Sequence, residues 1–241
     1  MEQPALLGKP ADLGEIFLVM HTRLGEIFFF FRSNIMALLA VTLPFAIATS
    51  LIVHGVGEPV VADGKSFAVN STSALLLSLL YPLALGAKVI AIHRLARGEG
   101  ITFAALLVDT LRAWPVLAGI SLLMGLAVGS GLFLFIVPGI WCYARLGYAP
   151  ILAVTEKLGV IAALTTSWQR TQAQQLELFT LAMLIGGVLV MIMLLVLNLI
   201  SHTWANTPLA ADIAARSLDE LLFCLLTIAF YRYGSLAVRT P

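Results

Sequence analysis

Four long stretches of this chain contain no Asp, Glu, Lys or Arg. They cover residues 33–57, 66–87, 113–144 and 178–211. An α-helix needs about 20 mostly apolar residues to cross the roughly 30 Å hydrocarbon core of a bilayer. Soluble domains do not contain several apolar runs of this length in succession. The pattern therefore predicts an all-α fold that lies mostly in lipid.

Composition supports a membrane protein and excludes some classes of partner. Only 27 of the 241 residues are charged, and 60% are hydrophobic, which is typical of chains that cross a bilayer several times. The formal net charge of +1 gives no broad basic field, so we expect no nucleic-acid partner. Membrane lipids are the expected partners, together with other membrane proteins.

We expect a single membrane domain over residues 1–241, with a cytoplasmic amphipathic segment at 1–34 and six transmembrane helices. The predicted spans cover about 35–53, 74–92, 114–136, 138–155, 178–200 and 218–238. The third and fourth come from one run, because 113–144 as a single helix would be about 48 Å long. Pro138 and Gly139 are the expected helix break, since proline cannot continue the backbone ladder and glycine tolerates a turn.

The distribution of basic residues predicts the orientation. With six spans and the N-terminus inside, nine basic residues are cytoplasmic (Lys9, Arg23, Arg32, Arg94, Arg97, Arg112, Lys157, Arg170 and Arg239) and two are outside (Lys65 and Arg216). With five spans the ratio falls to seven against four, a poorer fit to the positive-inside rule. Both termini are therefore predicted to be cytoplasmic.

Amphipathic stretches precede the first, third and fifth spans. The pentapeptide LGEIF occurs at 13–17 and again at 24–28, which places Glu15 and Glu26 on one helical face. Such helices tend to lie in the membrane interface. Three repeated units, each an in-plane helix followed by a transmembrane hairpin, would produce this pattern, and so would ordinary amphipathic connectors.

Arg145 is the main candidate for a functional residue, because a charge inside a span is costly and is retained for a reason. The favoured interpretation is an ion pair with Asp219 or Glu220. The alternative is that Arg145 binds an anionic group, such as a lipid phosphate, between helices. Lys88 and Arg232 lie near span ends, where snorkelling accounts for their charges.

Small residues recur every four positions in two of the spans. They are Ser121, Gly125 and Gly129 in the third span, and Ala182 and Gly186 in the fifth. This spacing lets helix backbones approach closely. Such faces serve either folding of the monomer or self-association, and we expect them to pack within the monomer.

The sequence contains no recognisable catalytic or cofactor-binding motif. The four histidines are scattered over both sides of the predicted membrane, without the paired spacing of a zinc site. No glycine loop of the phosphate-binding type is present. We therefore expect a protein that is not an enzyme and that needs no metal or other cofactor.

Three nearby segments carry a family resemblance. They are Val137–Pro150 (VPGIWCYARLGYAP), Thr155–Val160 (TEKLGV) and Ala163–Thr171 (ALTTSWQRT). Together they resemble the signature of the YciC-like bacterial inner-membrane proteins, and they are also similar to the membrane domain of some glycerophosphodiester phosphodiesterases. The resemblance implies a six-helix inner-membrane protein linked to maintenance of the bacterial envelope. It supplies no catalytic residue.

Two functions fit these observations. The first is a non-enzymatic protein of the bacterial inner membrane that assists envelope or lipid homeostasis through contacts with lipids or membrane proteins. The second is a transporter of lipid or a small solute, with a cavity around Arg145 between helices bent by prolines. The sequence favours the first function, because it predicts small-residue helix faces and in-plane helices but contains no recognisable catalytic or cofactor-binding motif.

Overall fold

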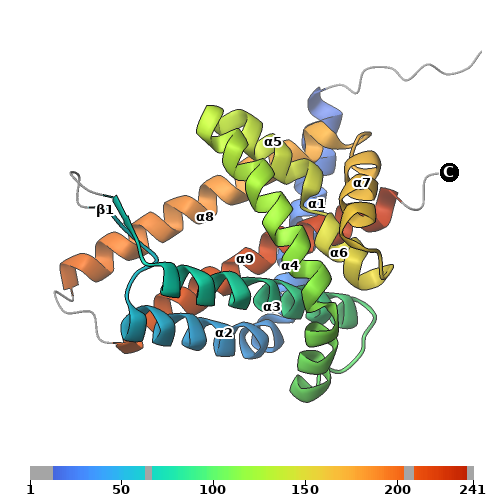
Figure 1. Ribbon diagram of the computed structural model, residues 1–241. Coiled ribbons are helices and arrows are strands. Elements are labelled where there is room, and N and C mark those ends of the chain that lie inside the picture. Colours follow the sequence, from blue (N-terminus) through green and yellow to red (C-terminus); the bar gives the residue numbers. More distant parts are fainter. Residues whose placement is uncertain (1–12, 63–66, 204–208, 238–241) are drawn as a thin grey trace, which may run out of the picture.

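A computed structural model describes residues 13–62, 67–203 and 209–237. Within them the chain forms helices and one short β-hairpin (Figure 1). Lys9, Lys65 and Arg239, which entered the orientation count, lie outside the described residues, as does the last residue of the predicted sixth span.

The first helices follow the predicted boundaries closely. Helix α1 (Leu13–Ser33) leads directly into α2 (Ile35–Val56), and α3 covers Ser71–Ala96. Between α2 and α3, strands β1 (Val60–Ala62) and β2 (Phe67–Val69) pair antiparallel, with Val60 opposite Val69. The hairpin was not predicted, because each strand has only three residues and falls below the length at which periodicity is informative.

Asn70 fixes the start of α3. Its Oδ1 accepts a hydrogen bond from the backbone N–H of Ser73 at 3.3 Å, while its Nδ2 donates to the carbonyl of Val56 at 2.7 Å. The first bond satisfies a donor that the helix leaves free, as N-cap residues do. The second joins the beginning of α3 to the end of α2.

The third and fourth predicted spans differ from expectation. Helix α4 (Phe103–Leu134) is continuous, so the amphipathic stretch and the third span form one helix. The predicted fourth span is divided into α5 (Ile136–Leu146) and α6 (Ala149–Thr155). Neither piece alone reaches the roughly 20 residues that a crossing needs.

The uncharged run 113–144 does break near Pro138, but the break lies one helical turn before the proline. Pro138 and Gly139 lie inside the first turn of α5, and the break is at Phe135, whose backbone is extended. In a continuous helix the Pro138 ring would collide with the carbonyl of Leu134, and α4 ends at Leu134. In the first turn of α5 the missing N–H costs nothing, because that donor has no partner within the helix.

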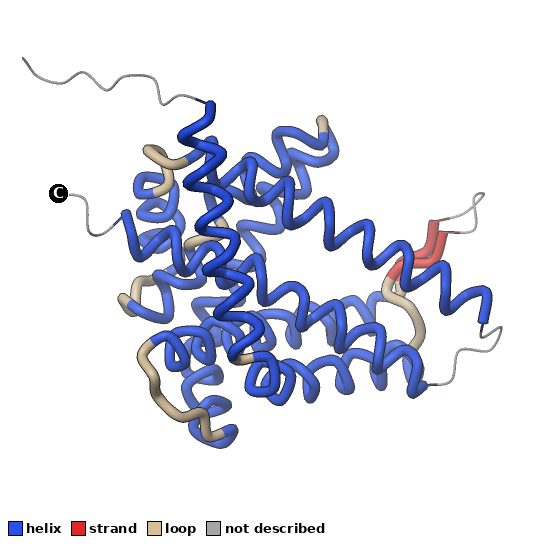
Figure 2. The backbone as a smooth tube through the Cα atoms, turned by 180° about the vertical axis from the view of Figure 1, so that it is seen from behind, coloured by secondary structure: helices blue, strands red, loops and turns tan. Residues whose placement is uncertain are grey.

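The remaining helices complete the bundle. They are α7 (Val160–Arg170), α8 (Gln175–Thr203) and α9 (Leu209–Ala237). Helix α9 runs back beside α8 and packs against α2 (Figure 1). Helix α1 lies across one side of the bundle, at a steep angle to α8 and α9 (Figure 2).

Four helices in the described part of the chain are long and apolar enough to cross a membrane. They are α2, α3, α4 and residues Gln175–Val196 of α8, which correspond to the first, second, third and fifth predicted spans. Helix α9 is less apolar and carries Asp212, Asp219 and Glu220 in its first half. The outer faces of these helices expose large apolar side chains such as Phe133 and Met191, as expected of surfaces that contact lipid.

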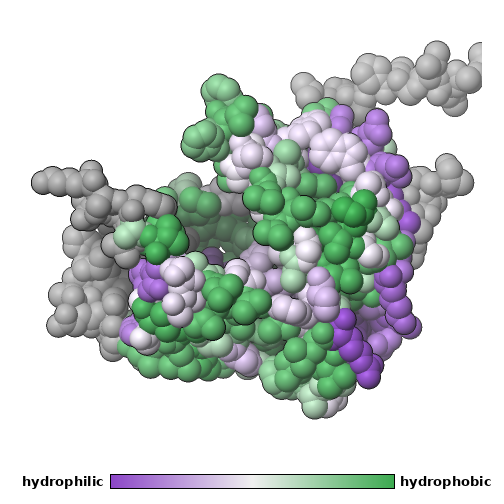
Figure 3. Space-filling model, viewed as in Figure 1, coloured by the Kyte–Doolittle hydropathy of each residue, from purple (hydrophilic) through white to green (hydrophobic). Residues whose placement is uncertain are grey.

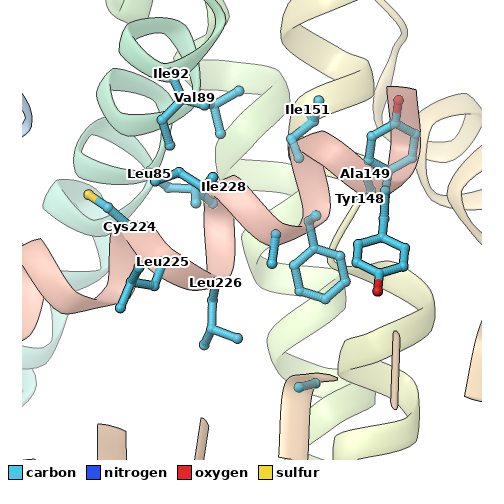
Figure 4. Packing of buried hydrophobic residues seen from close by; sticks show 14 of the residues in the cluster. Leu85, Val89, Ile92, Tyr148, Ala149, Ile151, Cys224, Leu225, Leu226 and Ile228 are labelled. Carbon is cyan, nitrogen blue, oxygen red and sulfur yellow. The ribbon is translucent and has the colours of Figure 1, made fainter. Parts of the chain in front are cut away.

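The core lies where α3, α5, α6, α8 and α9 meet. Leu85, Val89 and Ile92 of α3 face Ile151 of α6 and Ile228 of α9 (Figure 4). Residues 84–92 of α3 are all buried, and this unbroken burial is typical of a helix enclosed on every side. One of those buried residues is Lys88.

Candidate functional site

A cavity of about 290 Å³ lies between α3, α4, the α5–α6 segment and α9. In Figure 3 the surface is hollowed between the α4–α5 hairpin and α3. Its walls are mostly apolar, with hydroxyl groups at a few positions. The lining residues are Tyr81, Leu85, Val89, Ser121, Met124, Gly125, Val128, Tyr143, Gly147, Pro150, Ile151, Phe223, Thr227 and Phe230.

The turn between α5 and α6 shapes one wall of this cavity. The rings of Tyr143 and Phe230 meet edge to face, with centroids 5.5 Å apart. A Cβ atom on Gly147 would lie 2.7 Å from Cζ of Phe230, so only glycine lets the ring pack against this turn. The aromatic wall therefore depends on the glycine that separates α5 from α6.

The small-residue face of α4 opens onto the cavity. Ser121 and Gly125 line it, and a Cβ atom added to Gly125 or to Gly129 would meet nothing within 4 Å. The prediction that these glycines pack against another helix of the monomer is therefore wrong. Gly186 of α8 likewise has open space beside it. One close helix contact of α4 is at Gly131, where a Cβ would lie 2.8 Å from Cα of Gly139.

A buried ion pair lies next to the cavity wall. Nζ of Lys88 on α3 donates to Oε2 of Glu220 on α9 at 2.6 Å, and Lys88 is 2% exposed. The same ammonium lies 5.0 Å from the ring centre of Phe223, a cavity residue. Snorkelling is therefore the wrong explanation for Lys88, because its charge is neutralised inside the bundle.

The sequence contains a signal for this pair that hydropathy alone does not use. Lys88 follows an uncharged stretch of 22 residues, 66–87, and is followed by Val89-Ile90-Ala91-Ile92. A helix that is apolar on every side is buried, so a lysine within it needs an acidic partner. Glu220 belongs to the acidic pair that begins the sixth predicted span.

Arg145 is buried in the protein, and its partners differ from the predicted ones. The guanidinium lies over the ring of Trp168 at 4.4 Å from the centroid, and Nη1 donates to Oε1 of Gln175 at 3.4 Å. Glu220 pairs with Lys88 instead, and Asp219 is exposed. The expected ion pair between Arg145 and Asp219 or Glu220 is therefore not formed.

The backbone of Arg145 also joins α5 to α7. Its carbonyl accepts hydrogen bonds from Oγ of Ser167 at 2.8 Å and from Oγ1 of Thr171 at 3.2 Å. Its Nε is buried without a hydrogen-bond partner among the described residues. The motif segments 137–150 and 163–171 are thus in direct contact. Arg145 is not among the residues that line the cavity described above.

Arg232 forms another contact between residues that lie far apart in the sequence. Its Nη1 lies 3.3 Å from Oε2 of Glu26, in the second copy of the repeated pentapeptide. This pair connects α1 to α9. Unlike Lys88, Arg232 keeps a side chain that is 42% exposed.

Comparison with known proteins gives distant bacterial relatives. The chain is 27% identical over 168 residues to a UPF0259 membrane protein of Serratia proteamaculans (strain 568), a match covering 70% of this chain and 64% of the relative. It is 28% identical over 165 residues to a UPF0259 membrane protein of Yersinia pestis (strain Pestoides F), covering 68% of this chain and 62% of the relative. Each match thus covers less than two thirds of the relative's length.

No protein-family profile matches the chain, and no solved structure is similar to it. The relatives are named as membrane proteins, and the helices here have the apolar composition that spanning a bilayer requires. The chain is therefore similar in sequence to bacterial proteins named UPF0259 membrane proteins.

Proposed function

We propose that this protein is a non-enzymatic integral protein of the bacterial inner membrane, and that it assists lipid or envelope homeostasis by binding a lipid tail in the α3–α4–α9 cavity. The observation that carries the proposal is the composition of the cavity wall. Apolar and aromatic side chains dominate it, while Ser121 and Thr227 add hydroxyl groups. Such walls favour an apolar ligand that a few polar groups orient.

The size of the cavity and its neighbouring helices support a lipid as the occupant. Its volume of about 290 Å³ is near the lower end of the roughly 300–1,000 Å³ that ligand pockets occupy, so it suits part of an acyl chain. Helix α4, which forms one wall, exposes Leu122 and Leu126 to the surroundings. A tail could therefore enter sideways from the bilayer.

The proposed topology retains six passages, with both termini in the cytoplasm. Helices α5 and α6 together return the chain along α4, and α9 returns it along α8. Because α4 and α5 form a hairpin, α6 ends on the side where α4 begins. The assignment of basic residues to the cytoplasm is then the same as in the six-span prediction.

The arrangement of α1 and α7 supports in-plane helices on the cytoplasmic side. Hydrophilic residues gather at one end of the molecule, over α6, α7 and the α3–α4 loop (Figure 3).

Membership of the YciC-like group is part of this proposal. It is supported by the motif segments and by the membrane-protein names of the bacterial relatives.

Native mass spectrometry of gently extracted protein tests lipid binding. Gly125→Leu places a side chain in the cavity, and Gly129→Leu places the same side chain on the same helix outside the cavity lining. We expect wild type and Gly129→Leu to retain bound lipid, and Gly125→Leu to retain several-fold less. Equal retention by all three proteins would contradict the proposal. Thermal unfolding of each variant in detergent would show that the fold is intact.

The alternative function is transport of a lipid or small solute, and it can be tested with the same purified protein. Wild type reconstituted in vesicles should bind lipid without accelerating the movement of a labelled lipid between leaflets. Accelerated movement that Gly125→Leu abolishes would instead favour the transporter, with the cavity rather than Arg145 as its path.

A further inference from the structure

A second cavity, of about 590 Å³, lies at the end of the molecule opposite the β-hairpin. It is formed by the end of α3, the first part of α4 and the turn between α6 and α7. Its apolar floor includes Ile90, Val116 and Val154, and its rim is charged. The cavity is therefore amphipathic, unlike the one described above.

Three of the charged groups at the rim, Arg94, Asp109 and Glu99, are already neutralised. Arg94 donates to the carboxylate of Asp109, and Glu99 accepts from Nε of Arg97 at 2.8 Å. His93 is occupied as well, because its Nδ1 lies 2.9 Å from the hydroxyl of Tyr231. The charges of the paired groups cancel, so the net charge of the cavity comes from its remaining cations.

Arg112 and Lys157 are those remaining cations. Arg112 comes no closer than 3.9 Å to Asp109, which already binds Arg94, and its side chain is 79% exposed. Within the described residues, Lys157 makes no ion pair shorter than 4 Å. Two elements thus bring two cations to one cavity, Arg112 with only a long contact to a shared carboxylate and Lys157 without an ion pair among the described residues.

The backbone holds Lys157 in an unusual conformation. Its φ is +54°, in the left-handed region that non-glycine residues seldom adopt. The adjacent Glu156 accepts two hydrogen bonds from Arg170 of α7, one of them at 3.0 Å, and this carboxylate raises the pKa of the Arg170 guanidinium. The turn is therefore fixed by a bidentate pair. Such fixed local strain is often found at binding sites.

The position of the cavity favours a phosphate group as the ligand. Arg94 follows the second predicted span, Arg112 precedes the third and Lys157 follows the fourth, so all three lie just beyond the ends of the apolar segments. This is the depth at which lipid headgroups lie. We propose that Arg112 and Lys157 bind a phosphate there, above an apolar floor that suits the glycerol end of a lipid. The inference rests on the membrane location proposed above, but not on the tail-binding cavity.

The test uses full-length protein in nanodiscs of phosphatidylcholine with or without phosphatidylglycerol. Arg112→Gln and Lys157→Gln each remove one charge from the site, and Arg32→Gln removes one from the exposed last turn of α1. We expect phosphatidylglycerol retained after extraction to fall about tenfold in the first two variants, the effect of one charge-assisted hydrogen bond. Arg32→Gln should bind as wild type.

Lys157→Gly separates binding from folding. Glycine tolerates the left-handed backbone, so this variant should unfold at the same temperature as wild type or higher. It should nevertheless lose phosphatidylglycerol to the same extent as Lys157→Gln. Lys157→Arg should retain binding, because it keeps the charge.

A second measurement distinguishes the source of the phosphate. Inorganic phosphate is added to protein in pure phosphatidylcholine nanodiscs, and thermal unfolding is followed. Stabilisation that requires Arg112 and Lys157, without selective retention of phosphatidylglycerol, would identify free phosphate as the ligand. If neither phosphatidylglycerol nor phosphate depends on these two residues, the proposal is wrong. Phosphatidylglycerol retention that depends on Arg112 and Lys157, together with equal total lipid retention by wild type and Gly125→Leu, would support this proposal and contradict the tail-binding proposal.

Discussion

Lys88 and Glu220 form an ion pair at 2.6 Å that links α3 to α9, although 132 positions separate them in the sequence. Lys88 is almost completely enclosed, between an apolar core and the Phe223 ring. Taking such a charge out of water is costly, and only a close partner offsets the loss of hydration. The pair therefore fixes how α9 docks against α3.

Lys88→Met should destabilise the protein strongly, because it leaves the Glu220 carboxylate partly buried and unpaired. Breaking a buried pair costs about 3–5 kcal/mol. The double variant Lys88→Met/Glu220→Met should recover much of this loss, since no charge remains. Thermal unfolding in a mild detergent measures both effects, with Arg32→Met as the exposed control. Equal destabilisation by Lys88→Met and Arg32→Met would contradict the assignment.

Arg145→Leu should weaken the docking of α5 against α7 and α8. The substitution removes the stacking on Trp168 and the hydrogen bond to Gln175. We expect a loss of about 1–3 kcal/mol in unfolding free energy. Arg145→Lys should be intermediate, because lysine keeps the charge but loses the planar stacking group.

The partner variant Trp168→Leu provides the control for Arg145. If the two side chains act through one contact, the double variant Arg145→Leu/Trp168→Leu should lose less stability than the sum of the single variants. Additive losses would show that Arg145 is held by something other than Trp168.

Gly131→Ala should disturb the hairpin of α4 and α5. Its new Cβ would lie 2.8 Å from Cα of Gly139, so the two helices must separate, at a cost of about 1–3 kcal/mol for overpacking. Gly129→Ala is the matched control, because the space beside Gly129 is open. Comparison of the two unfolding temperatures tests the prediction, which fails if Gly129→Ala is the more damaging change.

Reporter tags test the proposed topology. A reporter fused to either terminus should be active only on the cytoplasmic side, because six passages return the chain to where it began. A reporter inserted between β1 and β2 should be found on the opposite side. Termini on opposite sides of the membrane would contradict the proposed threading and the headgroup depth assigned to Arg112 and Lys157.

Hydropathy predicted the long apolar helices well because it acts through local sequence. The predicted first span, 35–53, lies within α2, and the second, 74–92, lies within α3. Lipid compels each such segment to satisfy its backbone hydrogen bonds internally, so the run of apolar residues by itself determines a helix. The break near Pro138 follows from equally local sterics. Its displacement to Phe135 reflects the reach of the proline ring one turn backwards.

The amino-acid sequence by itself thus determined the long apolar helices, but not the division of the predicted fourth span into α5 and α6 or the β-hairpin. Only the tertiary structure decided that Glu220 neutralises Lys88 rather than Arg145, and that Gly125 faces a cavity rather than a helix. Charge and size restrict the possible partners of a side chain. The choice among them depends on how distant helices cross, and that is set by the packing of the whole bundle.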